Sequence, residues 1–587
     1  MTISKPDVKL EAHSTRPSTE DEKLSTLAPP PADPEAQPPP TTPPNHDLGL
    51  PTLTGWRLHL VLTSLFLGLF LSFLDTTIVA VALSTIATQF NDFDHSTWVL
   101  TAYLLTYMAF AIIMSRFSDI FGKKSVEVAS FVVFLCFSLA CGLSQSMTQL
   151  IVFRALQGIG GSGLYSMTMV VAVNLVAPSK MGMMGAAVGM VIVVSGVLGP
   201  VLSGAISNDP NSDTWRWIFF VNLPVGGLAL AALLVAWPSQ KTQKSFSRSA
   251  FKSIDILGCV LLLAASVLLI FALQEGGAFV YAWSSATIIA CLVISGLSWV
   301  GFFVWQQCLA AHPHWTVKLV FPIGVLRQRV VGAAMLATIF AGFNYYIALV
   351  NLPQRFQIVD GNKPVIAGVK LLPMMVSSAV GSLIGGSVNS RRNLTSYVLV
   401  ASSALQLLGY GLMTTLGDTS QTPHSQFGFQ VFLGLGFGLA MPAVTIMGQT
   451  QVEPRWIAVT QGALTQMRSL GGSVGLAAAV IVSNSKIRHS QALASALTSD
   501  QMSALLRSPL HIASFTPQQH RMVSAVFAEA FTQEMRVTMY IAAASLLVSL
   551  LTLQRNPPPL QRGPPPAKTE AGSGEMADVT SSSERAV

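Results

Sequence analysis

Three charged side chains lie inside long apolar stretches of the sequence, where their types could support chemistry. Asp75 follows Leu74 in one stretch, Arg154 opens a glycine-rich run in another, and Arg468 lies in the middle of a third. Inside a lipid bilayer such a charge costs about 2.5–3.5 kcal/mol on insertion scales, so it usually marks a polar cavity, an ion path or a proton relay. An acid near a helix end can instead reach the membrane interface, and this alternative stays open for Asp75.

The composition places these stretches in a membrane. Of the 587 residues, 51% are hydrophobic and only 10% are charged, against about a quarter charged in a typical soluble domain. A soluble fold of this size could not cover its surface with so few charges, which excludes a soluble enzyme, a nucleic-acid-binding protein and a disordered scaffold. The sequence has no CxxC pair, no His cluster and no Walker A motif, so we expect no metal, no cofactor and no ATP hydrolysis.

Apolar segments long enough for a membrane helix, about 20 residues, recur fourteen times between two polar tails. The tails, residues 1–55 and 555–587, are rich in proline and polar residues and are predicted to be disordered. The fourteen predicted spans cover residues 58–83, 97–115, 126–145, 150–173, 183–206, 216–236, 255–274, 284–306, 330–352, 365–387, 395–416, 426–448, 457–483 and 536–554.

The distribution of Lys and Arg predicts the orientation of these spans. With a cytoplasmic N-terminus, the cytoplasmic loops hold 14 of these residues and the short outer loops hold three, Arg216, Arg355 and Lys363. The net charge of +7 then faces a membrane surface rather than nucleic acid. Both termini are predicted to be cytoplasmic, and the sequon at Asn393 falls on the cytoplasmic side, where it stays unglycosylated.

Two further motifs could control movement. The turn Ser115–Lys124 combines a glycine suited to a tight turn with an acid that can cap a helix and pair with basic groups. Its candidate gate residues are Asp119, Gly122, Lys123 and Lys124. The fifth span contains small residues and a proline that allow close helix contact and bending, namely Gly196, Gly199, Pro200 and Gly204.

Taken in order, these motifs resemble those of the major facilitator superfamily, and more closely its fourteen-span drug:proton antiporters, which include fungal toxin and multidrug efflux pumps. The resemblance covers about residues 56–480. It is carried by Leu74–Leu83, Ser115–Lys124, Arg154–Gly163, Gly189–Gly204, Trp215–Gly226, Asp255–Gly258, Leu273–Gly277, Gly368–Pro373 and Arg468–Gly475.

The resemblance implies an all-α integral membrane fold with two six-helix bundles and two inserted helices. The bundles would occupy residues 56–236 and 330–554, the inserted pair would lie in a linker at 237–329, and residues 484–535 would form a long outer loop. Such carriers work by alternating access around a site near the bilayer midplane. A monomer in the plasma membrane is expected.

Transport coupled to protons needs a titratable group that is exposed alternately to each side, and Asp75 with Arg154 are the candidates. The substrate cavity should be apolar with a few polar anchors. Helix–helix hydrogen bonding is the alternative role for each candidate anchor. These candidates are Gln157, Asn222, Gln274, Asn344, Tyr345, Tyr346, Gln461 and Arg468.

The leading hypothesis is a proton-coupled exporter of amphiphilic small molecules, such as drugs or a fungal secondary metabolite. A siderophore or nutrient carrier of the same fold is one alternative. A non-transporting membrane sensor is another, but both tails lack a foldable signalling domain.

The predicted orientation can be tested with single cysteines placed at Lys244 and Arg391, which both belong to predicted cytoplasmic loops. In intact cells a membrane-impermeant maleimide should label neither, and after permeabilisation it should label both. Labelling of only one of the two positions in intact cells would contradict the orientation.

Overall fold

The computed structural model describes residues 55–90, 92, 95–175, 181–206, 213–238, 253–277, 281–312, 317–362, 364–416, 423–453, 456–507 and 515–558. Across these ranges the regular structure is helical, apart from an isolated β-bridge between Ile254 and Lys318. This confirms the predicted all-α fold.

Ten of the described helices are long and apolar enough to cross a membrane, or eleven if the pair α2 and α3, bent by 47°, forms one span. The chain is therefore a multi-pass membrane protein. A helix covers the greater part of each of the fourteen predicted segments, yet some fall short in length or apolarity, so the count of fourteen stays a prediction.

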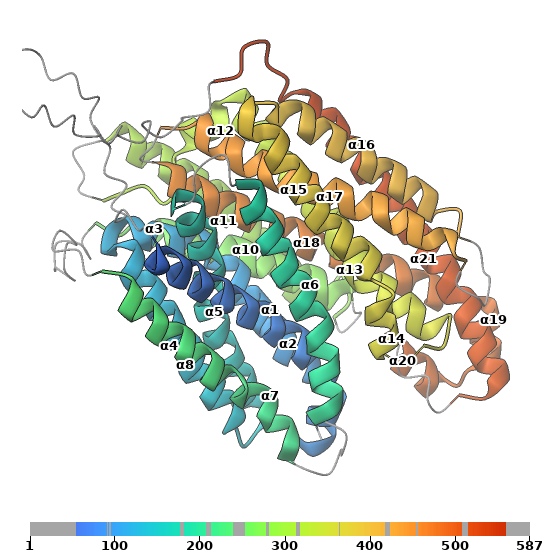
Figure 1. Ribbon diagram of the computed structural model, residues 1–587. Coiled ribbons are helices and arrows are strands. Elements are labelled where there is room, and N and C mark those ends of the chain that lie inside the picture. The colour runs from blue at the N-terminus through green and yellow to red at the C-terminus, as the bar shows by residue number, and fades with distance from the viewer. Residues whose placement is uncertain are drawn as a thin grey trace, which may run out of the picture. The chain divides into compact units, whose positions relative to one another are not determined.

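The first group of helices, blue to green in Figure 1, packs around α1. Helix α1 contacts α5, α6 and α8, while α4 and α2 pack on α5. The bounds in this group are α1 (Trp56–Phe90), α2 (Ser96–Ala109), α3 (Ala111–Phe121), α4 (Lys123–Gly142), α5 (Met147–Leu175), α6 (Met181–Ile206), η2 (Asp213–Arg216), α7 (Trp217–Phe220) and α8 (Asn222–Ala236).

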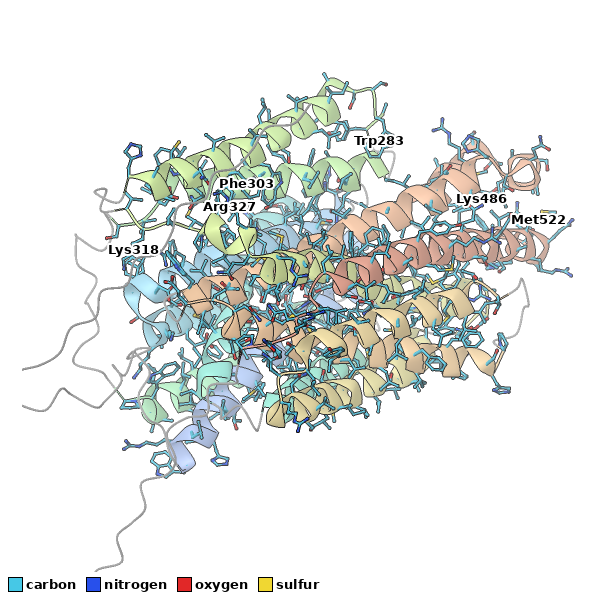
Figure 2. All side chains as sticks on the ribbon, turned by 90° about the horizontal axis from the view of Figure 1, so that it is seen from above. Trp283, Phe303, Lys318, Arg327, Lys486 and Met522 are labelled. Carbon is cyan, nitrogen blue, oxygen red and sulfur yellow. The ribbon has the colours of Figure 1, made fainter. Side chains whose placement is uncertain are left out.

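Helices α10 (Ile256–Gly277) and α11 (Ala286–Ala311) correspond to the predicted inserted pair and pack on each other. Ser295 on α11 donates to the Ala265 carbonyl at 2.7 Å. Helix α10 also contacts α2 and α18 (Ile457–Arg488), whereas α11 presents many exposed apolar residues. The pair thus forms a flank of the helical assembly, as Figure 2 shows.

The last group packs through α15 on α17, α13 on α18, and α16 on α17 and α21. The predicted division of the chain into two bundles and a linker stays a prediction. The bounds are α12 (Ile323–Arg327), α13 (Arg329–Ile358), α14 (Pro364–Val369), α15 (Leu372–Arg391), α16 (Thr395–Met413), α17 (Ser425–Thr450), α18 (Ile457–Arg488), α19 (Gln491–Ala496), α20 (Ser499–Arg507) and α21 (Pro517–Leu550).

The segment 484–535, expected as a long loop, is largely helical where it is described. Thr516 and Gln519 form a capping box at the start of α21, with Pro517 in its first turn, so this helix begins well before the predicted span at 536. Apolar side chains from α13, the end of α18, α19, α20 and α21 form a separate small core. Figure 2 places Lys486 and Met522 at the opposite end of the helices from Lys318 and Arg327.

Arg355 corrects one predicted boundary. The sequence placed it in an outer loop, but α13 continues to Ile358 and buries this side chain to 1% exposure. Its guanidinium lies over the Phe531 ring, 5.0 Å from the ring centre. Because the aromatic contact and the helix extension bury the charge, Arg355 does not count among the outer-loop cations.

Close contact between α15 and α17 depends on Gly438. A Cβ at this position would lie 2.8 Å from the Ser378 carbonyl carbon and 2.9 Å from the Ser382 amide nitrogen, and backbone atoms cannot rotate away. Gly428, on the same helix, is exposed and has no atom within 4 Å of its virtual Cβ.

We therefore expect Gly438→Ala to destabilise the protein by about 1–3 kcal/mol through overpacking. Gly428→Ala is the matched control and should be neutral or slightly stabilising, because alanine favours a helix. The thermal midpoint of the purified protein in detergent, followed by size-exclusion chromatography, measures both. Equal midpoints for the two variants would contradict the proposed close contact.

Candidate proton-coupling and substrate site

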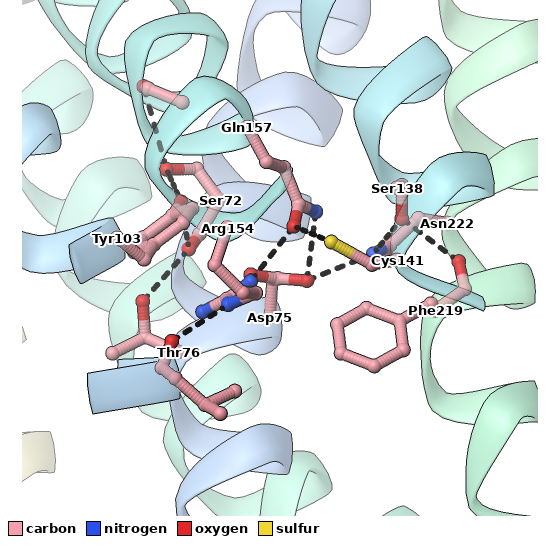
Figure 3. A network of polar contacts seen from close by, with 12 residues as sticks. Ser72, Asp75, Thr76, Tyr103, Ser138, Cys141, Arg154, Gln157, Phe219 and Asn222 are labelled. Atoms are coloured by element: carbon pink, nitrogen blue, oxygen red, sulfur yellow. Dashed lines mark hydrogen bonds and ion pairs between the residues drawn. The ribbon is translucent and has the colours of Figure 1, made fainter. Parts of the chain in front are cut away.

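Asp75 lies at the centre of a buried polar network (Figure 3). Its side chain is 0% exposed and forms an ion pair with Arg154, which is also fully buried. Gln157 Nε2 and Asn222 Nδ2 donate to the same carboxylate oxygen, Oδ1, at 3.0 and 3.1 Å. The carboxylate therefore has charge-assisted partners from α5 and α8, and the polar groups of three helices meet at one point.

The Arg154 guanidinium has further partners that hold it in place. Its Nε donates to the Val99 carbonyl at 3.1 Å, and its Nη1 also donates to Gln157 Oε1 at 2.8 Å. The guanidinium lies 4.2 Å from the Tyr103 ring centre and 5.8 Å from that of Phe219. Arg154 thus links α1, α2 and α5 through one cation, and the cation–π contacts lower the cost of burying its charge.

The aromatic sequence Trp215–Phe220 positions Asn222. Trp215 is fully buried, and the Phe219 carbonyl accepts a hydrogen bond from Ser138 at 2.9 Å. Asn222, the first residue of α8, donates to Ser138 Oγ at 3.0 Å as well as to Asp75. The Asn222 amide is therefore fixed from two sides, by Asp75 of α1 and by Ser138 of α4, and the Phe219 carbonyl of α7 in turn holds Ser138.

Glycines of α6 allow it to approach α1 beside Asp75. A Cβ at Gly199 would lie 3.0 Å from the Ile78 amide nitrogen, and it would be in still closer contact with Thr77. Thr77 Oγ1 donates to the Ser195 carbonyl at 3.0 Å. Helix α6 continues from Met181 to Ile206, through all four predicted antiporter-motif residues.

The predicted gate residues cluster where α3 meets α4. Arg116 donates to Asp119 at 3.2 Å, and Gly122 has a φ of +91°, a conformation that suits glycine. Lys123 is buried, while Lys124 donates to the Trp237 carbonyl. Arg116 also lies over the Trp456 ring at 5.6 Å, and Gly462 of α18 packs tightly on Ser115. The turn therefore contacts the later part of the chain, and its role as a gate stays a prediction.

The predicted substrate-cavity residues divide into separate places. Gln157 and Asn222 bind Asp75, whereas Gln461 donates to the Thr445 carbonyl at 2.9 Å. Asn344 donates weakly to Gln406 at 3.4 Å, and the Oε1 of Gln274 has no partner among the described residues. These positions do not converge on one cavity, and their assignment to substrate stays a prediction.

Arg468, Tyr345 and Tyr346 lie nearer to one another. Arg468 lines a cavity with Thr338, Phe437 and apolar side chains of α13, α16 and α17. Tyr345 stacks on Phe437 with ring centres 3.6 Å apart. Tyr346 packs against Gly472, one helical turn after Arg468. Arg468 therefore lines one small, mostly apolar cavity, Tyr345 packs on Phe437 of its lining, and Tyr346 packs on the same helix as Arg468.

Sequence reasoning missed several buried polar residues. Tyr165 accepts a hydrogen bond from Arg468 at 2.8 Å, which joins α5 to α18. Glu127 is fully buried, and its carboxylate oxygens have no partner in the part of the chain that the structure describes. Buried Glu534 accepts from Asn351 at 2.7 Å. Tyr165 lies three helical turns after Arg154 on the same face of α5, and this spacing could have identified Tyr165 from the sequence.

In the part of the chain that the structure describes, helices with many apolar spans and a buried ion pair between them define a multi-pass membrane protein of the kind that carriers form. The sequence profile of the Major Facilitator Superfamily matches residues 65–476. The MFS-type transporter FPY5 of Fusarium mangiferae is 36% identical over 517 residues, which are 86% of this chain and 85% of that protein. The rubrofusarin-specific efflux pump aurT of Gibberella zeae is 31% identical, over 74% of this chain and 78% of that protein.

Solved structures agree on the fold. A bacterial homolog of the human lysosomal transporter Spinster, in an inward-facing conformation, aligns with a TM-score of 0.52 at 16% identity, covering 85% of this chain and 98% of that one. The chain belongs to the Major Facilitator Superfamily, as its sequence motifs predicted. It is a transporter and not an enzyme.

The ion pair predicts a stability change that a double variant can isolate. Asp75→Asn should leave Arg154 as a buried, unbalanced cation and lower stability by about 3–5 kcal/mol. The double variant Asp75→Asn/Arg154→Gln removes both charges and should recover much of this loss. The thermal midpoints of the wild type and both variants in detergent measure these changes. An Asp75→Asn variant as stable as the wild type would contradict the ion pair.

Proposed function

We propose that the protein is a proton-coupled efflux transporter that exports amphiphilic small molecules by alternating access. The observation that carries the proposal is the buried ion pair between Asp75 and Arg154. Both side chains of this ion pair are 0% exposed. A carboxylate held in this way can gain a proton only when the surrounding helices admit water, which ties protonation to conformation.

Proton binding would alter the forces within the network. A neutral Asp75 no longer balances the Arg154 charge, so the guanidinium would depend on Val99, Gln157 and Tyr103. Arg154 and its helix would then favour a different position relative to α1. Entry of a proton from outside and its release inside would therefore exchange two arrangements of the helices. A membrane potential adds about 2.3 kcal/mol per charge per 100 mV to the free energy that proton entry supplies.

The direction of transport rests on relatives whose names describe efflux. The rubrofusarin-specific pump is one, and fungal secondary metabolites are the substrate class we propose for this chain. The cavity beside Arg468 is apolar, but its volume of about 10 Å³ has room for no more than one water. An amphiphilic substrate would therefore enter only after the surrounding helices separate. We further propose a monomer in the plasma membrane, two six-helix bundles with an inserted pair, and cytoplasmic termini.

The proton-coupling role predicts the behaviour of Asp75→Asn. Cells that carry this variant should lose active export, because the amide cannot bind and release the proton, and should accumulate substrate as untransformed cells do. An acidic outer medium should stimulate wild-type export, and an uncoupler should abolish it. Transport is measured with a fluorescent amphiphilic dye and is normalised to the amount of protein in the membrane.

Asp255→Asn is the matched control for this experiment. Asp255 is also buried and accepts hydrogen bonds, from the Gly258 amide at 2.8 Å and Trp305 at 2.7 Å, but it lies outside the Asp75 network. Asparagine keeps the oxygen that caps the start of α10 but loses the acceptor of the Gln306 amide. That loss is structural, so transport normalised to the protein in the membrane should persist. Wild-type export by Asp75→Asn would remove this residue from proton coupling.

A further inference from the structure

Arg468 carries a buried charge for which the surrounding helices offer no acid. Arg468 is 8% exposed, and its guanidinium donates to the neutral hydroxyl of Tyr165 at 2.8 Å. The helices that line its cavity or contact it, α5, α13, α16, α17 and α18, contain no Asp or Glu in their sequences. A desolvated cation is costly without a counter-charge, so this site favours an anion brought in from outside the chain.

Aromatic rings surround the same position from both sides. Tyr165 stacks with Tyr107 at a centroid distance of 6.0 Å and contacts Phe73 edge to face at 5.8 Å. On the other side, Tyr345 and Phe437 stack in parallel, and Phe437 lines the cavity with Arg468. Flat apolar faces of this kind suit a planar ring system better than a flexible chain.

A second polar group in this region lacks a partner. The Tyr107 hydroxyl is buried and makes no hydrogen bond of normal geometry among the described residues, although the Ser72 side chain lies near it. The Tyr107 ring stacks on Tyr165, whose hydroxyl binds Arg468. A buried hydroxyl without a partner costs free energy unless a ligand or water supplies one. The cation and this free hydroxyl are therefore two independent features that a polar, ring-containing ligand would satisfy.

From this juxtaposition we propose that Arg468 is the anion-recognising residue of the substrate site, and that the preferred substrates are planar aromatic molecules with one acidic group, such as a carboxylate or an ionised phenol. The guanidinium binds the acid, and the Tyr107, Tyr165 and Tyr345–Phe437 rings pack on the aromatic body. The proposal rests on the proposed transport function, because it names the substrate class of that function.

The hydrogen bond from Arg468 to Tyr165 would be broken when a substrate anion binds. A substrate anion competes with the Tyr165 hydroxyl for the same guanidinium, and a hydrogen bond between two ionised groups is stronger than one from the guanidinium to a neutral hydroxyl. Binding of the anion therefore weakens a direct link between α5 and α18. Loss of that link is a direct way for substrate to change the contact between these two helices.

The test measures equilibrium binding to the purified full chain in lipid nanodiscs. Three fluorescent probes share one ring system and differ in charge: anthracene-9-carboxylate, anthracene-9-carboxamide and 9-(aminomethyl)anthracene. At neutral pH the carboxylate should bind about ten-fold more tightly than the other two, as expected for one charge-assisted contact. Excess chloride should not displace the bound carboxylate, because a small ion makes no contact with the aromatic rings. Displacement by chloride would identify a simple halide site and contradict the proposal.

Two variants locate the effect. Arg468→Gln should weaken carboxylate binding about ten-fold while the carboxamide changes little. Arg355→Gln is the matched control, because Arg355 is also a buried arginine of the later helices but lies far along α13 near Phe531, and the carboxylate preference should persist. If Arg468→Gln does not fold, the relative affinities of the three probes for the wild type still decide whether the site prefers an anion.

The proposal is overturned if the amide or the ammonium probe binds the wild type as tightly as the carboxylate, if no probe binds at millimolar concentration, or if Arg468→Gln keeps the preference. Binding requires no proton gradient, so these outcomes are independent of the Asp75→Asn transport experiment. A carrier that prefers anions but ignores uncouplers would retain this site and lose the coupling mechanism.

Discussion

The cost of burying a charge in a low-dielectric interior controls how the early helices of this chain are arranged. Asp75 and Arg154 remain buried because each compensates the other and because neighbouring helices supply the remaining partners. Helix α8 begins with the amide that binds Asp75, and α2 presents a carbonyl and a ring to Arg154. Displacing any of these helices would expose a charge to lipid or leave it buried without a partner. The ion pair therefore fixes their relative positions more strongly than apolar packing alone.

Contacts between early and late helices have a different character. Besides Arg468 with Tyr165, they include Ser473 with the Met108 sulfur and Gln466 with the Ile112 amide. Each of these is a single hydrogen bond to a neutral group, and each can be replaced by water or substrate at small cost. Strong polar links inside the early helices and weaker ones across to α18 would allow the α5–α18 contact to open without loss of internal structure, while α6 still packs on α15.

The helical segments and the family followed from the sequence, because apolar length and local motifs are properties of neighbouring residues. The ion pair was predicted only as two candidate residues, since the sequence shows that Asp75 and Arg154 are both costly but not that they meet. Residues without a local signal were harder to predict. Arg355 resembled a loop cation, and Glu127 was overlooked, because burial by distant helices decides both cases.

Helix α5 connects the Asp75–Arg154 ion pair with Arg468. Arg154 and Tyr165 are eleven residues apart, so they lie on one helix face about 16 Å apart along its axis. Through the first residue α5 binds Asp75, and through the second it binds Arg468. A helix moves as a rigid body over this length. Under the proposed mechanism, a change in the charge of Asp75 would therefore shift Tyr165, and a substrate anion that replaced Tyr165 on Arg468 would free the other end of α5. Proton and substrate would then compete for the position of one helix, which is the reciprocity that the proposed exchange transport requires.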